Sequence, residues 1–219
     1  MWSPDGHWIA YTSVRGGKFG FYRKASDGSG SEEVLAEPVL EPRYTDDWSP
    51  DGKYVAYTEL DQGIWAIRML PVAGERKPFV FLQSAFNQLY PRFSPDGKWV
   101  AYSSLESGRM EVYVVPFPGP GGKRQVSTGG GAQPSWRRDG KEIYYLGPDD
   151  KLMAAQIKAT DSSLEIGTVS SLFDAHSFRS GHWSYDASAD GSRFVINRSG
   201  EEPGAAMNLA VNWDVGLKK

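Results

Sequence analysis

The feature that most constrains this fold is a short turn motif, Ser-Pro-Asp-Gly or a close variant, which returns along the whole chain. Its core pairs are Asp5–Gly6, Asp51–Gly52, Asp96–Gly97, Asp139–Gly140 and Asp190–Gly191, at steps of 46, 45, 43 and 51 residues. Repeats of about 40 to 50 residues are typical of four-stranded propeller blades. The spacing therefore predicts an all-β fold, a β-propeller of about five four-stranded antiparallel blades with incomplete terminal blades.

Each motif has the chemistry of a corner between two strands, because proline presets one turn dihedral, aspartate suits the next position and glycine accepts a positive φ. The predicted corners are residues 3–6, 49–52, 94–97, 137–140 and 188–191. The strands after them, such as 99–104, carry apolar residues on both faces, so we expect neighbouring blades to cover both. Third strands are expected at positions such as 111–116, and the fourth strand of the fourth blade is expected at 170–173, after an insertion. One repeat column of tyrosines should lie in this core, namely Tyr11, Tyr57, Tyr102 and Tyr145.

The two ends of the repeat are uneven. The first corner follows Trp2 directly, and the last blade is predicted to stop after a third strand at Asn208 to Trp213. We treat residues 1–219 as one propeller domain or fragment, and we expect it to be the C-terminal part of a longer protein. Unpaired strand edges at the terminal blades would favour self-association.

Composition excludes several function classes. The chain has 24 Lys and Arg against 27 Asp and Glu, a net charge of -3, which does not favour nucleic-acid binding. It has no cysteine for a disulfide, a thiolate metal site or a nucleophile. No apolar run is long enough to span a bilayer, so we expect no membrane contact by this segment. None of this identifies the compartment.

No complete catalytic or metal constellation is found. The three histidines, His7, His176 and His182, do not have the His-Glu-x-x-His spacing of a zinc site. The chain also lacks the Gly-x-Ser-x-Gly motif, whose serine nucleophile a histidine base would activate. The glycine-rich stretch 119–122 lacks the spacing of a phosphate loop, and the acidic stretch 27–33 lacks the twelve-residue calcium pattern. We therefore expect no enzyme activity, no metal and no cofactor.

The better candidates are for binding. The rim opposite the corners collects arginine and aromatic residues, the types that dominate interface hot spots. The rim candidates are Arg15, Arg43, Tyr44, Phe86, Tyr90, Arg109, His176 and Arg179. Charged residues just before the corner aromatics should lie near the central channel, where we expect them to pair across blades; these are Asp46, Asp47, Arg92 and Asp186.

The corners WSPDGKYVAYTE and FSPDGKWVAYSS, with the strand MEVYVVPFP, resemble the repeats of TolB-type propellers, also called PD40 or WD40-like repeats. The later part, from VYVVPFPGPGGKRQVSTGGG to the ending NLAVNWDVGLKK, is similar to the C-terminal propeller of bacterial Ser/Thr protein kinases of eukaryotic type. No kinase signature occurs in the chain itself. The resemblance implies a sensory or protein-binding module, extracytoplasmic in its parent.

The favoured hypothesis is thus a non-catalytic binding propeller with a protein or peptide partner. One alternative is the gating propeller of a prolyl-oligopeptidase-like or tricorn-like peptidase, which a downstream hydrolase domain would indicate. The other is a propeller enzyme with its active site in the channel, which the scarcity of histidine disfavours.

Overall fold

The strands form successive antiparallel sheets, each built around one corner of the repeat. The computed structural model describes residues 1–119, 121–160, 163–177 and 183–198, and all statements of structure refer to these. The strands of the first two sheets are β1 (Trp8–Arg15), β2 (Lys18–Ala25), β3 (Glu33–Val39), β4 (Arg43–Trp48), β5 (Tyr54–Asp61), β6 (Ile64–Pro71) and β7 (Phe79–Leu82). The third sheet contains β8 (Gln88–Phe93), β9 (Trp99–Ser104), β10 (Glu111–Pro116) and β11 (Arg124–Gln125).

The last two sheets differ in size. They contain β12 (Ala132–Trp136), β13 (Glu142–Leu146), β14 (Lys151–Ala159), β15 (Leu164–Asp174), β16 (Tyr185–Ala187) and β17 (Phe194–Ile196), with one 3-10 turn, η1 (Pro148–Asp150). Within the described ranges there is no α-helix. The fold is thus the predicted β-propeller of about five blades.

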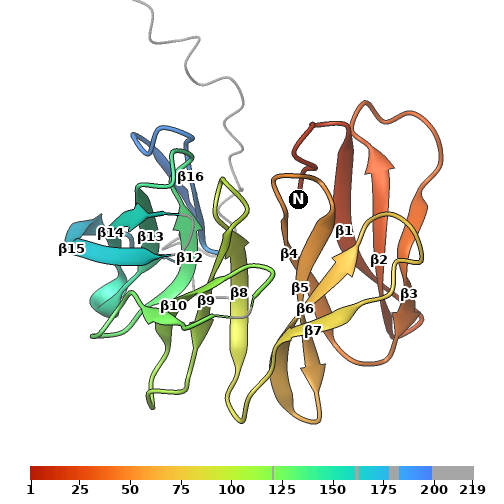
Figure 1. Cartoon of the computed structure of the whole chain (residues 1–219). Helices are drawn as coiled ribbons and strands as arrows, with labels where there is room; N and C mark the ends of the chain where they lie inside the picture. Colours follow the sequence, from red (N-terminus) through yellow and green to blue (C-terminus); the bar gives the residue numbers. More distant parts are fainter. Residues whose placement is uncertain (120, 161–162, 178–182, 199–219) are drawn as a thin grey trace, which may run out of the picture.

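Three of the sheets have four strands that pair in chain order, from an inner strand outward. The first sheet has β1, β2 and β3, with Trp2 forming a single bridge to Ile9, and the last has β16 and β17. The predicted third strand of the last blade, at 208–213, lies outside the described residues. Figure 1 shows β1–β7 on one side of the molecule and β8–β16 on the other. The strands β4 and β8 face each other at the centre, where the two halves meet.

Most predicted strands are confirmed, and β9 and β10 have the predicted bounds. The clearest difference is the fourth strand of the fourth blade. We expected it only at Ser170 to Phe173, but β15 begins at Leu164 and pairs with β14 along nearly its whole length, across two register shifts. The predicted insertion before this strand is therefore part of the sheet.

The corners have the predicted turn geometry. All five corner glycines have a positive φ, between 70° and 75°. In the third corner the Ser94 hydroxyl donates to Asp96 at 2.5 Å and accepts from the Trp99 backbone N–H at 3.0 Å. Ser3, Ser49 and Ser188 make the same two bonds in their own corners. The corner is thus a self-contained unit that satisfies its own polar groups.

The fourth corner reaches the same shape with different chemistry. Arg137 replaces the serine, and its guanidinium donates two hydrogen bonds of 2.8 Å to the two carboxylate oxygens of Asp139. A third bond of 2.8 Å reaches Glu142. The guanidinium lowers the pKa of Asp139 to about 2. This bidentate pair explains why the motif tolerates arginine here.

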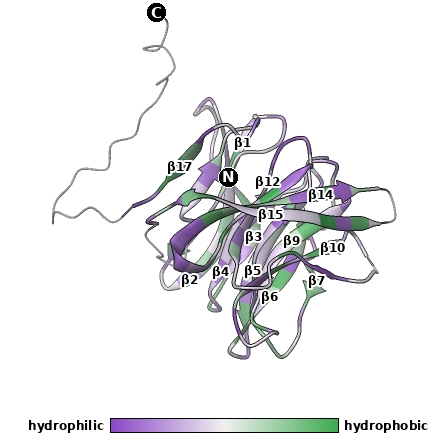
Figure 2. Cartoon of the chain, turned by 90° about the vertical axis from the view of Figure 1, so that its left-hand side faces the viewer, coloured by the Kyte–Doolittle hydropathy of each residue, from purple (hydrophilic) through white to green (hydrophobic). Residues whose placement is uncertain are grey.

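The core lies between blades, as expected from strands that are apolar on both faces. Four apolar clusters separate the successive sheets. The strand β10, largely green in Figure 2, contributes valines to two of them. Tyr57, Tyr102 and Tyr145 are at most 3% exposed, each packed against the preceding blade. Tyr11 is only half-buried, because no described blade covers that face of the first sheet. Its hydroxyl donates to Glu32 instead.

Candidate functional site

The inner strands share a bulge that turns their charged residues toward the centre. The register of β4 shifts between Thr45 and Asp47, and that of β8 shifts between Leu89 and Arg92. A bulge re-aims the side chains beside it. The strands β4 and β8 lie side by side, so the bulges bring Asp47 and Arg92 together.

Asp47 joins the second and third blades. One carboxylate oxygen lies 3.4 Å from the Arg92 guanidinium, and the other accepts the Phe93 backbone N–H at 2.8 Å. Burial raises the pKa of the Asp47 carboxyl, and the charge of Arg92 partly offsets this. The predicted pairing of charges across blades is therefore present here.

Asp46, beside it, forms no ion pair with any residue that the structure describes. Its side chain is buried, and its contact is the Thr58 hydroxyl, which donates at 3.0 Å. Burial raises the pKa of Asp46 to about 7, while the Thr58 bond and the charge of Arg92 act in the opposite direction. Asp46 is thus a carboxyl group that titrates near neutral pH at the wall of the channel.

Aromatic residues cover the other side of Arg92. Its guanidinium carbon lies 3.8 Å from the centre of the Trp183 ring, and Tyr90 packs edge-on against the same ring at 5.4 Å. Tyr90 has a φ of 58°, which is strained for a residue with a side chain. Burial raises the pKa of the Tyr90 hydroxyl. The third and fifth blades are therefore joined across Trp183, which precedes β16.

These groups line one open cleft of about 510 Å³, which we call the axial cleft. Its lining residues are Met1, Trp2, Thr45, Asp46, Asp47, Arg92, Trp183, Ser184, Tyr185, Asp186, Val195 and Asn197. The lining has three carboxyl groups and two cationic groups, namely the amino group of Met1 and the Arg92 guanidinium, which is already paired with Asp47 and stacked on Trp183. Such a surface favours a positively charged group held against an aromatic wall.

The rim candidates do not form one surface. Arg43 is only 4% exposed, so it is not available at the rim as expected. Its guanidinium donates to the carbonyl oxygens of Phe19, at 3.1 Å, and of Glu37, and it stacks on Phe21. A guanidinium held by carbonyls of the preceding blade stabilises the contact between the first two blades.

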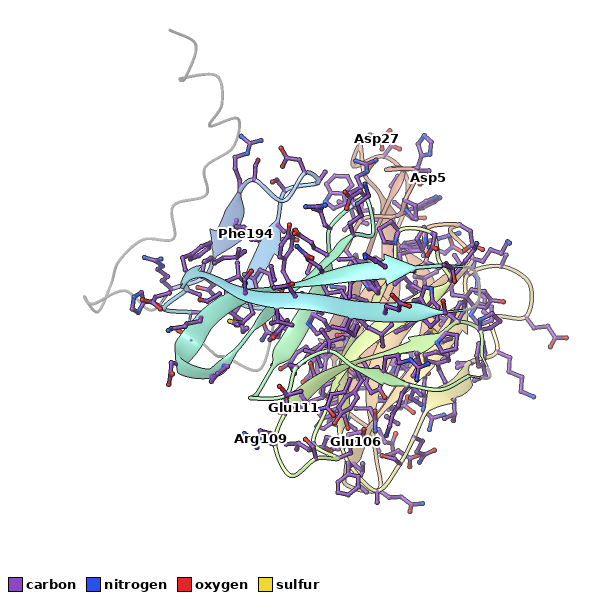
Figure 3. The ribbon with its side chains drawn as sticks, turned by 60° about the vertical axis from the view of Figure 1, so that its left-hand side comes forward. Asp5, Asp27, Glu106, Arg109, Glu111 and Phe194 are labelled. Carbon is purple, nitrogen blue, oxygen red and sulfur yellow. The ribbon has the colours of Figure 1, made fainter. Side chains whose placement is uncertain are left out.

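The remaining candidates occupy separate places. Arg15 is exposed and forms an ion pair of 2.7 Å with Glu32. Tyr44 packs against Phe19 and Trp65, half-buried between two blades. Phe86, Arg109 and His176 are exposed on different blades. Figure 3 shows Arg109 with Glu106 at the end of the molecule opposite Asp5 and Asp27, as predicted for the two rims. Arg179 lies outside the described residues.

The sequence did not indicate a role for another residue at the centre, Gln133. Gln133, in the bulge of β12, receives the Ser184 backbone N–H at 2.8 Å on its side-chain oxygen, while its own carbonyl accepts the Tyr185 hydroxyl at 2.9 Å. These bonds attach the fifth blade to the fourth. Only the repeat column of Gln133, shared with Thr45 and Tyr90, could have indicated a role.

Among the described residues, no group of three or more His, Asp or Glu side chains is arranged to hold a metal ion. The same part of the chain contains no helix with the length and apolar character needed to cross a bilayer.

Solved structures with this fold include propellers of different functions. TolB from Acinetobacter baumannii is 24% identical with a TM-score of 0.69, over 91% of this chain and 48% of that one. A putative TolB from Agrobacterium tumefaciens is 21% identical with a TM-score of 0.63, over 77% and 63%. A puromycin-hydrolysing peptidase of Mycobacterium tuberculosis is 17% identical with a TM-score of 0.57, over 84% and 34%. Likeness at these identities shows the fold alone.

This chain therefore spans 63% or less of each of these three structures. No curated protein matches it. The family model described as the TolB beta propeller domain matches residues 24–212, which is most of the chain. Together with the corners and the stacked four-stranded sheets, this match shows that the chain belongs to the PD40 family of TolB β-propeller domains.

Proposed function

We propose that this propeller is a binding module without catalysis of its own, and that its axial cleft receives a basic side chain of a protein partner. The observation that carries the proposal is the acidic lining of the cleft, where Asp46, Asp47 and Asp186 outnumber two cationic groups, the Arg92 guanidinium and the amino group of Met1. Propellers of this family usually mediate protein interactions, and the cleft is where the inner strands of several blades meet.

The chemistry of the cleft supports a lysine or arginine ligand. Asp186 is exposed, and one of its carboxylate oxygens accepts only a short-range bond from the Ala187 backbone N–H at 2.9 Å. The Trp183 ring already holds one guanidinium, which shows that the wall has the geometry for cation stacking. Charge complementarity of this kind sets specificity and the association rate.

We further propose that the parent protein is a receptor-type Ser/Thr kinase with this propeller outside the cytoplasm. The support is the similarity of the segment from VYVVPFP onward to the propellers of such kinases. The sequence of the gene on both sides of this segment tests the proposal. A kinase domain and a membrane span upstream would support it, whereas a Gly-x-Ser-x-Gly hydrolase domain downstream would support the peptidase alternative and overturn it.

The cleft is tested with two fluorescein-labelled peptides, one with a central Lys-Lys pair in a Gly-Ser frame and one with Glu-Glu in its place. We expect the lysine peptide to bind at least about tenfold more tightly, and binding to weaken as salt is raised. Asp186→Asn should reduce its affinity about threefold or more. Asp27→Asn removes the same charge from an exposed loop of the first blade that does not line the cleft, and it should change nothing.

Equal affinity for the two peptides would overturn the assignment of the cleft to a basic ligand. Equal losses in Asp186→Asn and Asp27→Asn would do the same, because they would show that the peptide responds only to overall charge.

A further inference from the structure

The contact between the second and third blades shows how this fold holds a cation beside its axis. Asp47 on β4 lies opposite Ala56 on β5 in the antiparallel register. Its carboxylate lies 3.4 Å from the Arg92 guanidinium of the next inner strand and accepts the Phe93 backbone N–H at 2.8 Å. Phe93 in turn shares one apolar cluster with Ala56. The second blade therefore receives an extended pair of residues, a basic one followed by an aromatic one.

The fifth blade repeats the receiving half of this arrangement. Asp186 on β16 lies opposite Val195 on β17, just as Asp47 lies opposite Ala56. Each aspartate also accepts the backbone N–H of the residue that follows it. Directly opposed residues of an antiparallel pair place their side chains next to each other. Asp186 and Val195 therefore form the same kind of surface, a carboxylate beside an apolar side chain.

In the fifth blade this surface is open. Val195 is 74% exposed, whereas Ala56 and Ala101, at the equivalent positions of the second and third blades, are completely buried by the blade that follows each. Asp186 is exposed and forms no ion pair with any residue that the structure describes. Within the described part of the chain, the carboxylate and the apolar side chain thus have no counterpart of the Arg92–Phe93 pair.

The first-blade wall of the axial cleft is also apolar and exposed. Trp2 is 62% exposed and lines the same cleft as Asp186 and Val195. The aromatic residues directly before the next two corners, Trp48 and Phe93, are only 6% exposed, because each packs against the preceding blade. The cleft therefore combines an exposed carboxylate with two exposed apolar side chains, and exposed apolar surface gathered in this way is typical of binding sites.

The two cationic groups of the cleft are engaged elsewhere. The Arg92 guanidinium is paired with Asp47. The amino group of Met1 donates to the Ala10 carbonyl oxygen at 2.7 Å, and burial lowers its pKa. Of the three carboxyl groups, Asp186 is the exposed one, so it is the carboxylate that a cation from outside can reach.

We propose that the axial cleft recognises an extended segment of a partner protein in which a basic residue is followed directly by an aromatic residue. The basic side chain pairs with Asp186, and the aromatic side chain packs on the exposed apolar surface of Val195 and Trp2. Arg92 and Phe93 make the corresponding contacts on the second blade. This inference rests on the proposed function of the cleft, because it names the sequence that its basic ligand carries.

The probes are four fluorescein-labelled, capped peptides in one Gly-Ser frame, with Arg-Phe, Arg-Ser, Phe-Arg or Glu-Phe at the centre. Fluorescence polarisation measures their affinities for the protein. We expect Arg-Phe to bind about tenfold more tightly than Arg-Ser, because the phenylalanine ring leaves water on Val195 and Trp2. It should also bind about threefold or more tighter than Phe-Arg, since reversing the pair exchanges the two faces of an extended segment.

The outcomes separate this inference from the proposed function. Equal affinity for Arg-Phe and Arg-Ser, or for Arg-Phe and Phe-Arg, would overturn the inference but leave a basic ligand in the cleft. Equal affinity for Arg-Phe and Glu-Phe would overturn the proposed function and the inference together, because the cleft would then respond only to the aromatic ring.

Variants of the protein locate the aromatic contact. Val195→Ser should reduce the affinity for Arg-Phe to about that for Arg-Ser and leave the Arg-Ser affinity unchanged. Leu40→Ser, at a residue that is 68% exposed outside the cleft, should change neither. Trp2→Ala tests the same contact from the first blade, and it decides alone if Val195→Ser does not fold. An unchanged preference for Arg-Phe in these cleft variants would contradict the proposal.

A second copy of the chain is the competing occupant of the cleft. Sedimentation of the protein alone, with Asp186→Asn as the comparison, tests it. A dimer that this variant disperses would assign the cleft to the second copy and overturn the proposal, whereas the same mass for both proteins agrees with a separate partner.

Discussion

The corners and the axial cleft are built from neighbouring positions of the same repeat, yet they differ in one respect. Four of the five corners repeat the same serine-to-aspartate hydrogen bond, and in the fourth corner Arg137 donates to the aspartate instead. The inner-strand position just before them is Asp47, Arg92, Ser135 and Asp186 in successive blades. Positions with the same residue in every blade stabilise the fold, whereas positions whose residue differs between blades can bind a partner.

The blade interfaces follow the same rule. Three tyrosines of the repeat column are buried, whereas the residues at one equivalent position on the corner face differ in size: Val72, Phe117 and Ile157. The grooves beside Val72 and Ile157 have volumes of about 410 and 630 Å³. A difference between equivalent positions is therefore more informative about binding than the residue type alone.

The largest expected effect is at a repeated core position. Tyr102→Ala should lower the free energy of unfolding by about 3–5 kcal/mol, because it leaves a cavity between the second and third blades. Tyr11→Ala, the same change at the half-buried member of the column, should cost less than half as much. Urea unfolding of both variants measures the two losses in the free energy of unfolding. Equal losses would show that the column is not held by blade packing.

Next comes the corner serine. Ser94→Ala removes a hydroxyl that is both donor and acceptor at a site only 3% exposed, with an expected loss of about 1–3 kcal/mol. Ser188→Ala removes the same two bonds at a more exposed corner and should cost about 0.5–1.5 kcal/mol. Thermal unfolding of both variants compares the loss of stability at the two corners. A larger loss in Ser188→Ala than in Ser94→Ala would contradict the account.

The pH dependence of Asp46 gives a third comparison. Its pKa is about 7 in the folded protein and about 3.9 in an unfolded chain. The folded state therefore binds more protons between these values, and the free energy of unfolding should fall as pH rises from about 4 to about 7. Asp46→Asn should flatten this slope and be the more stable protein above pH 7. Parallel stability profiles for the two proteins would show that Asp46 is not desolvated.

The smallest effect is expected at the variant corner. Arg137→Ser restores the common motif, so its hydroxyl should take over the bond to Asp139. The lost ion pair with Glu142 is partly exposed and should cost less than about 1 kcal/mol. A loss of several kcal/mol in chemical unfolding would mean that the arginine has a role that the corner geometry does not explain.

Much of the fold could be predicted, because the Asp-Gly corners fix where β5, β9 and β13 begin. The full length of β15 could not, since its first half contains Glu165, Gly167 and Thr168, which are exposed and interrupt any apolar pattern. At the site, the charged residues of the axial cleft were found from their repeat column. Arg43 was misplaced because residue type and position suggest exposure, whereas the carbonyls that bury it belong to another blade.

The central claim, that recognition lies at the positions that change between blades, is tested most directly by photocrosslinking. The Lys-Lys peptide with a benzophenone beside the lysines is irradiated with the protein, and the linked residues are identified by mass spectrometry. The account predicts links to β4, to β8 and to residues 183–186, all reduced in Asp186→Asn. Links confined to the five corners, at 3–6, 49–52, 94–97, 137–140 and 188–191, would contradict it.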